Sequence, residues 1–424
     1  MFDTGTTAFM IVCTTLVFLM TPGLAFFYGG LSRRKNVVNT MLMCLTVVGV
    51  VGVSWVAAGW SFAYGGDGSI PVFGGVDQLG LAGVVQVLIA GAPGAVSHDA
   101  YPAIADIAFQ MAFAMITAAI ITGSLAGRMK FGAVVVFVAL WSLAVYAPLA
   151  HMVWGGEGSL VGDMIGALDF AGGDVVHISS GVTGLVLCLL LGRRRGFGVM
   201  SYRPHNVPFV VLGAALLWFG WFGFNAGSEF APDGVAALAL LNTVAASAAA
   251  LLSWMAVERI RNGKATLVGA ATGLVAGLVV VTPAAGFVEP WAAVVMGIVV
   301  SPCCYFAISA LKHKVGYDDA LDAFGCHAVG GIVGGVLTGV FCVPELSWTE
   351  FGGLLYTGDF ALLGAQVLGI LVTLAFVIVA DLVLGLVVKA LFRGSLRVSE
   401  QEEAAGLDVS AHGESAYPAY LGLD

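Results

Sequence analysis

Charged residues are scarce in this sequence. Asp, Glu, Lys and Arg together make up 10% of the 424 residues, whereas hydrophobic residues make up 59%. A water-soluble domain of this size needs a far more polar surface. The composition therefore excludes a soluble protein and predicts a polytopic protein embedded in a lipid bilayer.

Cysteine and basic residues are also few. The seven cysteines lie mostly inside apolar stretches, and their spacing indicates neither a disulfide framework nor a metal site. The 17 Lys and Arg residues form no nucleic-acid recognition motif. We therefore expect no metal, no cofactor and no nucleic-acid partner.

Long apolar stretches, by contrast, are abundant. Those able to cross about 30 Å of hydrocarbon cover residues 8–30, 38–64, 99–126, 131–152, 172–192, 207–226, 233–257, 265–285, 290–311, 321–342 and 361–392. The first has neither a basic n-region nor a convincing cleavage site, so we expect a retained helix and not a signal peptide. The predicted fold is an all-α membrane protein with eleven transmembrane helices.

The basic residues indicate the orientation of these helices. All 17 fall in six groups, which are Arg33 to Lys35, Arg128 with Lys130, Arg193 to Arg195 with Arg203, Arg259 to Lys264, Lys312 with Lys314, and Lys389 to Arg397. Every group lies on the same side of an eleven-helix path. The positive-inside rule then predicts an outside N-terminus and a cytoplasmic C-terminus.

Two histidines occupy similar places in apolar helices. His177 is followed by Gly181 and Gly184, and His327 is followed by glycines at the same offsets, 331 and 334. At 3.6 residues per turn each histidine shares a helix face with its glycines, where another helix can approach closely. A single such histidine is usually a hydrogen-bonded core residue. Because the pattern is repeated, we interpret the pair as lining a pathway through the membrane.

The histidines also suggest an internal repeat. They lie in the fifth and tenth predicted helices, so residues 8–192 and 207–342 form two five-helix units. Five is odd, and the second unit must enter from the opposite side, which gives an inverted repeat. The long eleventh helix, 361–392, completes a membrane domain over residues 1–397. Residues 398–424 form a polar, acidic tail, whose composition alone is typical of disorder.

A pathway lined by imidazole and phenyl groups suits a solute that sheds its charge on entry. Ammonium is such a solute, because an aromatic face can hold the cation and loss of a proton leaves neutral ammonia. A transporter or channel is one interpretation, and a sensor on the same scaffold is the alternative, although about 30 tail residues are few for a signalling domain. An intramembrane enzyme or metal site is disfavoured, since no nucleophile accompanies the histidines.

Several stretches resemble the ammonium transporter family, the Amt/Mep/Rh group, and its bacterial Amt branch most. They are Phe26 to Leu31, Ala150 to Gly156, Gly166 to Gly173, Gly220 to Ser228, Thr282 to Ala284, and Asp322 to His327. The resemblance covers nearly the whole chain. It implies a homotrimer in the inner or plasma membrane with one pore per subunit, carrying ammonium or ammonia, with methylammonium as an analogue.

The resemblance also implies roles for individual residues. The outer ammonium site comprises Trp154, Phe113, Ser228, Phe109 and Ala171. Phe113 and Phe224 form a stacked gate, and His177 and His327 share a hydrogen bond in the pore. Asp169 supports the backbone of the outer site, although an acid at a helix start is also typical of capping.

Three features extend or depart from this pattern. Residues 403–414 resemble the Amt tail segment that packs under the pore and takes part in regulation by PII-type signalling proteins, which favours docking over disorder. Asp174 and Glu229 are more acidic than the resemblance predicts. Asp174 either raises the basicity of His177, caps its helix or points outward.

Overall fold

Eleven helical runs are long and apolar enough to cross a membrane in the computed structural model, which describes residues 2–90, 96–97, 100–200 and 202–417. They are, in chain order, α1 (Thr4–Leu31); η1 (Arg34–Asn36), α2 (Val37–Ser54), η2 (Trp55–Gly59) and α3 (Trp60–Tyr64); α5 (Ala103–Leu125); α6 (Phe131–Trp141), η4 (Ser142–Tyr146) and α7 (Ala147–Trp154); η6 (Gly173–Ile178) and α8 (Ser179–Leu191); α9 (Val207–Gly227); α10 (Gly234–Asn262); α11 (Leu267–Val281) and η7 (Thr282–Ala284); α12 (Pro290–Phe306) and η8 (Ala307–Gly316); η9 (Phe324–Ala328) and α13 (Val329–Phe341); and α15 (Ala361–Leu391). The predicted all-α fold is confirmed.

Shorter elements lie in the connections and the tail. They are η3 (Leu79–Leu81), α4 (Val84–Ala90), strands β1 (Val96–Ser97) and β2 (Tyr101–Pro102), η5 (Leu160–Met164), η10 (Pro344–Leu346), α14 (Leu354–Thr357), α16 (Glu400–Ala405) and α17 (Leu407–His412). The two strands pair antiparallel, with Ser97 opposite Tyr101. None of these elements was predicted from apolar periodicity, since each is too short to show a period.

Helix ends differ from the predicted ranges where local chemistry decides them. The first helix begins at Thr4, four residues early, because Asp3 accepts a hydrogen bond from the Thr6 amide at 2.6 Å and caps it. The third begins at Ala103 instead of residue 99, because the preceding two residues belong to β2. The seventh continues to Asn262, where Gly263 closes it in the left-handed conformation, with φ of 78°.

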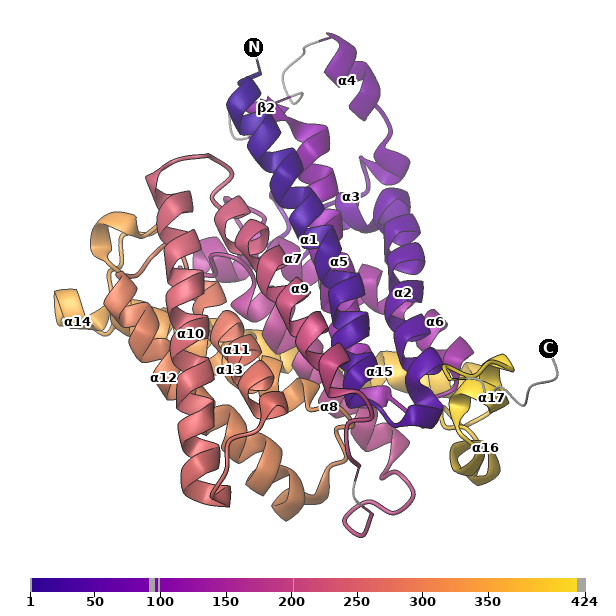
Figure 1. The fold of residues 1–424 in the computed structure, drawn as a ribbon. Coiled ribbons are helices and arrows are strands. Elements are labelled where there is room, and N and C mark those ends of the chain that lie inside the picture. The colour runs from indigo at the N-terminus through magenta and orange to yellow at the C-terminus, as the bar shows by residue number, and fades with distance from the viewer. Residues whose placement is uncertain (1, 91–95, 98–99, 201, 418–424) are drawn as a thin grey trace.

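The first helices of the two five-helix units pack side by side, α1 against α9 (Figure 1). Glycine permits this closeness on both helices. A Cβ at Gly30 would lie 2.6 Å from the Val210 amide, and one at Gly213 would lie 2.2 Å from the Phe27 amide. The two halves therefore meet backbone to backbone, as small residues allow in membrane bundles.

Helix α15 runs obliquely across the bundle, from α14 on one flank to the tail on the other (Figure 1). Its buried Gln366 joins it to the loop before η6 and to α13. The side-chain amide donates to the carbonyls of Leu168 at 2.9 Å and Gly335 at 3.1 Å, and its oxygen accepts from the Leu168 amide at 2.6 Å. Helix α15 therefore connects the loop before η6, in the first five-helix unit, with α13 in the second.

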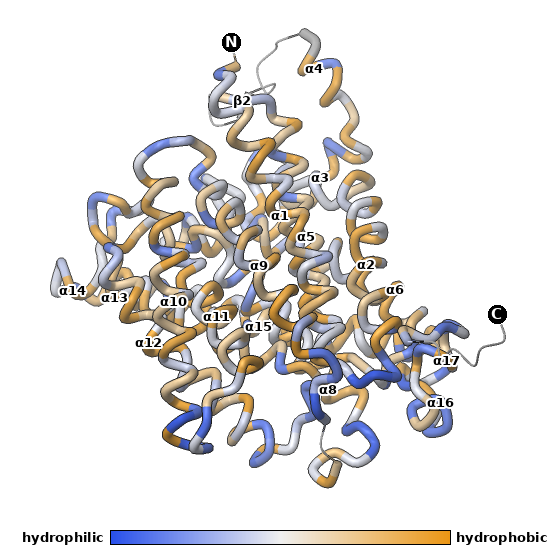
Figure 2. Tube along the Cα trace, in the orientation of Figure 1, coloured by the Kyte–Doolittle hydropathy of each residue, from blue (hydrophilic) through white to orange (hydrophobic). Residues whose placement is uncertain are grey.

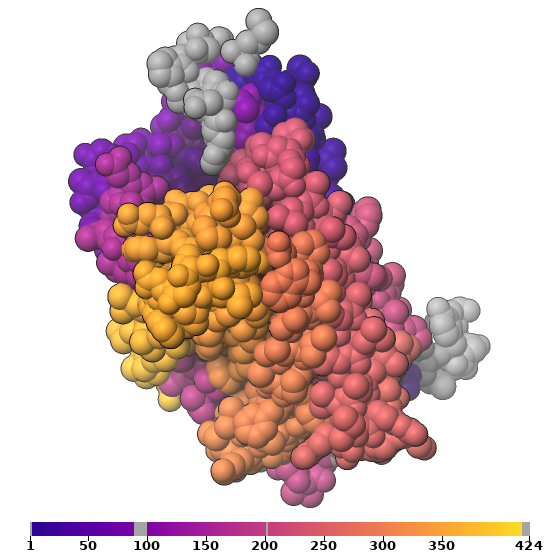
Figure 3. All heavy atoms as spheres, turned by 90° about the vertical axis from the view of Figure 1, so that its left-hand side faces the viewer, coloured from indigo at the N-terminus to yellow at the C-terminus, as the bar shows by residue number. Residues whose placement is uncertain are grey.

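Polar residues gather at the two ends of the bundle and apolar residues between them (Figure 2). Figure 3 shows a flank built mainly from the second half of the chain. Large apolar side chains that are exposed on α10 and α12 include Leu241, Leu252, Ile298 and Phe306. In an apolar solvent such as lipid this exposure carries no penalty.

Candidate functional site

His177 and His327 meet inside the bundle. Their Nδ1 atoms lie 3.3 Å apart, and their ring centroids are 5.3 Å apart at an interplanar angle of 32°. Both side chains are almost fully buried. One Nδ1 must donate and the other must accept, so one proton lies between the two rings. His177 Nε2 is buried and has no hydrogen-bond partner among the described residues, which leaves this nitrogen available to a passing molecule.

Glycine on each histidine helix allows this meeting. A Cβ at Gly181 would lie 2.5 Å from the Ala328 amide, and one at Gly331 would lie 2.9 Å from the Gly173 carbonyl and 3.2 Å from His177 Cβ. The close approach predicted from the glycine offsets is therefore found at the first glycine after each histidine. The histidines themselves lie in η6 and η9, which are π-helical turns. Such turns are frequent at functional sites.

A cavity of about 880 Å³ opens near the N-terminal end of the bundle, and Trp154, Phe113 and Ser228 all line it. The Trp154 indole donates to the Asp169 carbonyl at 2.8 Å, which fixes its ring. That ring meets Phe113 edge to face, with centroids 6.2 Å apart. Two aromatic faces and one hydroxyl thus converge on one space.

Two stacked phenyl rings lie beneath this cavity. Phe113 and Phe224 are buried, with centroids 4.0 Å apart and an interplanar angle of 12°. The Ser228 hydroxyl donates to the Phe224 carbonyl at 2.9 Å and connects the cavity wall to this ring pair. The stacked rings leave no open space between their faces.

Between the rings and the imidazoles only a very small space remains. It measures about 10 Å³ and is lined in part by His177, His327 and Phe224. This is at the lower limit of the space that one water molecule needs. A second cavity of about 250 Å³ lies beyond the pair and includes His327, Tyr28 and Asp322 in its lining. The histidines therefore separate two wider chambers.

Asp169 organises the loop under Trp154. Its Oδ1 accepts hydrogen bonds from the amides of Gly172 at 2.7 Å and Gly173 at 2.6 Å, and its Oδ2 accepts from Asp174 at 2.8 Å and Val175 at 3.3 Å. Four amide donors compensate a carboxylate for the water it has lost. These four amides lie at the start of η6 and also belong to the loop of the outer cavity. The contacts of Asp169 therefore agree both with capping of a helix and with support of the loop, the two interpretations drawn from the sequence.

Two residues assigned to the outer site do not reach its surface. Phe109 and Ala171 are fully buried, and neither is among the residues that line the cavity in the described part of the chain. Phe109 packs behind Phe113, with centroids 4.8 Å apart, and also contacts Phe230. It supports the gate ring from the side.

The two acidic departures lie in different surroundings. Asp174 is buried and its side chain faces Thr373 of α15. It does not point outward, and the amides at the start of η6 are bonded by Asp169 instead. Glu229 follows Ser228 on the wall of the outer cavity. Burial and the facing carboxyl of Asp233 raise the pKa of Glu229 to about 7.

Sequence reasoning missed two residues beside the pathway. Gln110 is 7% exposed and lines the outer cavity, and its Oε1 has no partner among the described residues. The sequence offered one indication that Gln110 lies at the site, its position three residues before Phe113. Trp221 stacks on His177 with centroids 5.3 Å apart, and its indole donates to Thr282 at 2.9 Å. The aromatic stretch around Trp221 is equally typical of core packing.

Metal chemistry has no support in the part of the chain that the structure describes. No group of three or more His, Cys, Asp or Glu side chains is placed to hold an ion there. The described cysteines form no disulfide.

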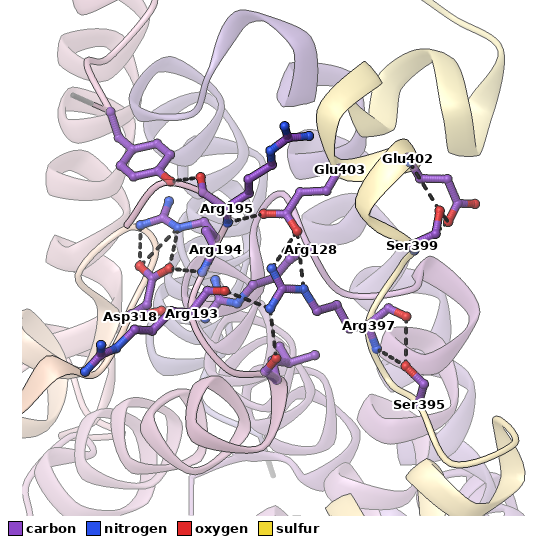
Figure 4. Close-up of polar contacts among 12 residues, drawn as sticks. Arg128, Arg193, Arg194, Arg195, Asp318, Ser395, Arg397, Ser399, Glu402 and Glu403 are labelled. Carbon is purple, nitrogen blue, oxygen red and sulfur yellow. Dashed lines mark hydrogen bonds and ion pairs between the residues drawn. The ribbon is translucent and has the colours of Figure 1, made fainter. Parts of the chain in front are cut away.

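The tail packs against the opposite end of the bundle from the outer cavity. Glu403 of α16 lies between basic residues (Figure 4), with an ion pair to Arg397 at 2.6 Å and a hydrogen bond from the Arg195 amide at 2.7 Å. Asp408 of α17 accepts from the Asn39 amide at 2.9 Å, at the start of α2. An acid at a helix N-terminus is favourable.

Backbone contacts add to this docking. The Leu407 amide donates to Asn36 at 2.9 Å, and His412 lies 2.9 Å from the Asn39 side-chain amide. Gly406 has φ of 105°, and a Cβ there would lie 2.6 Å from both the Cβ and the carbonyl oxygen of Lys35. The described tail therefore touches the first basic group of the sequence, Arg33 to Lys35, at close range.

Comparisons with known proteins agree with this architecture. The model of the Ammonium Transporter Family matches residues 8–417. An ammonium transporter of Aquifex aeolicus is 49% identical over 98% of this chain and 94% of its own length. The crystal structure of Saccharomyces cerevisiae Mep2 superposes with a TM-score of 0.85 at 36% identity, covering 94% of this chain and 88% of that one. A solved Sensor Amt Protein superposes with a TM-score of 0.86 at 27% identity, covering 96% and 98%.

These matches extend over nearly the full length of both partners, and they include the segments that carry the paired histidines and the aromatic cavity. The chain belongs to the ammonium transporter family, whose members are multi-pass proteins of the cell membrane.

Proposed function

We propose that the protein captures the ammonium cation in the outer cavity and conducts ammonia, with or without the released proton, past the paired histidines. The observation that carries the proposal is the succession of spaces in the bundle, in which stacked phenyl rings and then the paired imidazoles lie between two wider chambers. A solute that is cationic in the first chamber and neutral beyond it fits this arrangement.

Capture depends on Trp154, Phe113 and Ser228. An indole or phenyl face attracts a cation by roughly 0.5–2 kcal/mol, and a hydroxyl oxygen accepts one N–H. Such a site binds weakly, which suits a molecule that must leave again. Loss of a proton then removes the charge that would otherwise have to enter the dry gate.

The histidine pair takes the neutral molecule from the gate. His177 Nε2 is buried and no described residue bonds to it, so it can exchange a hydrogen bond with ammonia. The shared Nδ1 proton fixes which tautomer each ring adopts. Trp221 stacks on His177 and limits its rotation.

Assembly and regulation complete the proposal. We infer a homotrimer, supported by the family resemblance. We also infer that the end bearing the tail and its basic neighbours faces the cytoplasm. There the docked tail regulates flux and a PII-type signalling protein binds, as the tail's resemblance to Amt proteins suggests.

The fold alone does not separate transport from sensing, because the Sensor Amt Protein shares it. Uptake of labelled methylammonium into liposomes containing the purified protein does. We expect saturable uptake. Trp154→Leu should raise the half-saturating concentration several-fold, because it removes the face that attracts the cation.

Trp348→Leu is the matched control for that variant. Trp348 lines the same cavity, but it is 55% exposed and packs on Phe170 and Phe287. Its loss should leave the concentration dependence within twofold. Equal effects of both variants would refute the capture site. No uptake by the unaltered protein would refute the transport function.

A further inference from the structure

The short turn η7 packs against both of the helical runs that carry the paired histidines. A Cβ at Gly173 would lie 2.6 Å from Pro283 Cβ, and a Cβ at Gly334 would lie 2.9 Å from Pro283 Cγ. Gly173 begins the run of one histidine, and Gly334 lies in the run of the other. The stretch Thr282 to Ala284, to which the sequence resemblance gave no role, therefore lies beside the histidine pair.

The hydroxyl group of Thr282, the first residue of η7, holds the indole of Trp221. Both side chains are buried. The hydroxyl has one hydrogen, which it donates to the Leu278 carbonyl at 2.8 Å, whereas the Asn225 oxygen is farther away, at 3.4 Å. The hydroxyl oxygen is therefore free to accept the indole N–H at 2.9 Å. An indole nitrogen can only donate, so the loss of this acceptor would leave a buried donor unpaired, which is costly.

Trp221 in turn stacks on His177, with ring centroids 5.3 Å apart and an interplanar angle of 25°. Both rings, together with His327, line the narrow space of about 10 Å³. To turn about its Cβ–Cγ bond, the imidazole must pass through an orientation in which its edge points at the indole face. The stacked indole blocks that orientation in a close-packed interior. The Nδ1 atom of His177 therefore stays directed at the Nδ1 atom of His327, 3.3 Å away.

We propose that Thr282 is a positioning residue for the conduction step. Its hydroxyl fixes the indole of Trp221, and the indole keeps His177 in the orientation that pairs it with His327. This inference rests on the proposed function, because that function assigns conduction to the histidine pair. In the described part of the chain, Thr282 lines neither the outer cavity, the narrow space nor the second cavity. It therefore acts through Trp221 and not on the solute.

Thr282→Val tests the proposal, because valine has nearly the shape of threonine but lacks the hydroxyl group. Uptake of labelled methylammonium into liposomes containing the purified protein measures the effect. We expect the maximal rate to fall about tenfold, the equivalent of roughly one hydrogen bond. The half-saturating concentration should stay within about twofold, because the capture residues are unchanged. Thr282→Ser keeps the hydroxyl and should restore most of the rate.

Thr183→Val is the matched control. The Thr183 hydroxyl is also fully buried, accepts an indole N–H from Trp141 at 3.0 Å, and donates to the Ser179 carbonyl at 2.8 Å. Trp141 contacts the ring of Tyr146, and no ring contact joins it to a histidine among the described residues. Thr183→Val should lower the thermal denaturation midpoint about as much as Thr282→Val does. Its maximal rate should stay within about twofold of the unaltered protein. An equal loss of rate in both variants would mean a general loosening of the bundle, contrary to the proposal.

A double-mutant cycle tests whether Thr282 acts through Trp221. Trp221→Phe keeps an aromatic ring beside His177 but removes the N–H group. It deletes the same hydrogen bond from the other side, so it should lower the maximal rate and leave the half-saturating concentration unchanged, even if Thr282→Val does not fold. In the Trp221→Phe background, Thr282→Val should change the rate by less than about twofold, because no indole hydrogen bond is left to lose. A second full loss of rate there would overturn the inference.

The outcomes separate this inference from the function on which it rests. If the unaltered protein takes up methylammonium and Thr282→Val reaches the same maximal rate, Thr282 has no positioning role and the transport proposal stands. If Thr282→Val or Trp221→Phe changes mainly the half-saturating concentration, the effect lies in capture and the inference is also overturned. If the unaltered protein takes up nothing, both fail.

Discussion

Asp169 shows how one side chain can determine a functional loop. Its two oxygens accept from four successive amides, and the Trp154 indole is fixed by the carbonyl of the same residue. Gly172 enters this turn with φ of 115°, which suits glycine alone. The geometry of the outer cavity therefore depends on a residue whose carboxyl points into the backbone.

Asp169→Asn should damage both stability and capture. An amide keeps one acceptor oxygen but turns an N–H₂ group toward two amide donors, so about two hydrogen bonds are lost, at roughly 1.5–3 kcal/mol each. We expect a lower thermal denaturation midpoint for the detergent-solubilised protein and a raised half-saturating concentration for uptake. Denaturation followed by tryptophan fluorescence measures the first effect.

Asp163→Asn is the control for this prediction. Asp163 lies exposed in η5 on the same cavity, and among the described residues its carboxylate accepts one backbone hydrogen bond, from Gly158. Its replacement should shift the midpoint much less. Equal shifts of the denaturation midpoint in the two variants would mean that the four amide hydrogen bonds of Asp169 add no stability beyond the single one of Asp163.

The sequence predicted some site residues better than others for a physical reason. The histidines could be found because glycine offsets mark a close helix contact within one segment. The placement of Glu229 and Gln110 on the wall of one cavity depends on where separate helices lie in the fold. Phe109 and Phe113 are the same type of residue in the same helix, so only packing decides which of them faces the cavity.

At the scale of elements, the helix register near the histidines departs from the assumed period. Both η6 and η9 are π-helical, so the first turn holds more than 3.6 residues. Apolar patterns predicted where the eleven helices run, because burial in lipid governs them. They could not predict π-turns, since a single inserted residue changes the register without changing composition.

The contact of α16 and α17 with the start of α2 can be tested by mutation. Gly406→Val should detach the tail, because its Cβ would overlap Lys35 and its φ of 105° disfavours a branched residue. We expect faster trypsin cleavage at Arg397, which in the docked state is paired with Glu403. Mass spectrometry of timed digests measures the change.

Gly413→Ala separates crowding from backbone strain. Gly413 also has a positive φ, of 65°, but a Cβ there would meet nothing within 4 Å. It should leave cleavage at Arg397 nearly unchanged. If both variants are cleaved at the rate of the unaltered protein, the contact of Gly406 with Lys35 does not hold the tail.

At the scale of the whole molecule, the orientation in the membrane remains a prediction from the basic residues. Ser69 lies exposed in the connection after α3, and Glu400 lies exposed at the start of α16, at the opposite end of the bundle. Ser69→Cys should react with a membrane-impermeant thiol reagent added to intact cells. Glu400→Cys should react only after the membrane is opened.

The native cysteines give a low background for this measurement, because six of the seven are buried. The reverse pattern of labelling would place the N-terminus in the cytoplasm and invert the proposed direction of capture. Labelling of both positions in intact cells would indicate leaky cells and calls for the same assay in sealed vesicles.

The narrow space between the phenyl rings and the imidazoles has a consequence for the energy supply of the cell. A membrane that stores energy as a proton gradient loses it through any unbroken file of water. The rings of Phe113 and Phe224 and the space of about 10 Å³ below them interrupt such a file. A resting subunit should therefore not leak protons through continuous water, whether or not a proton accompanies ammonia during transport.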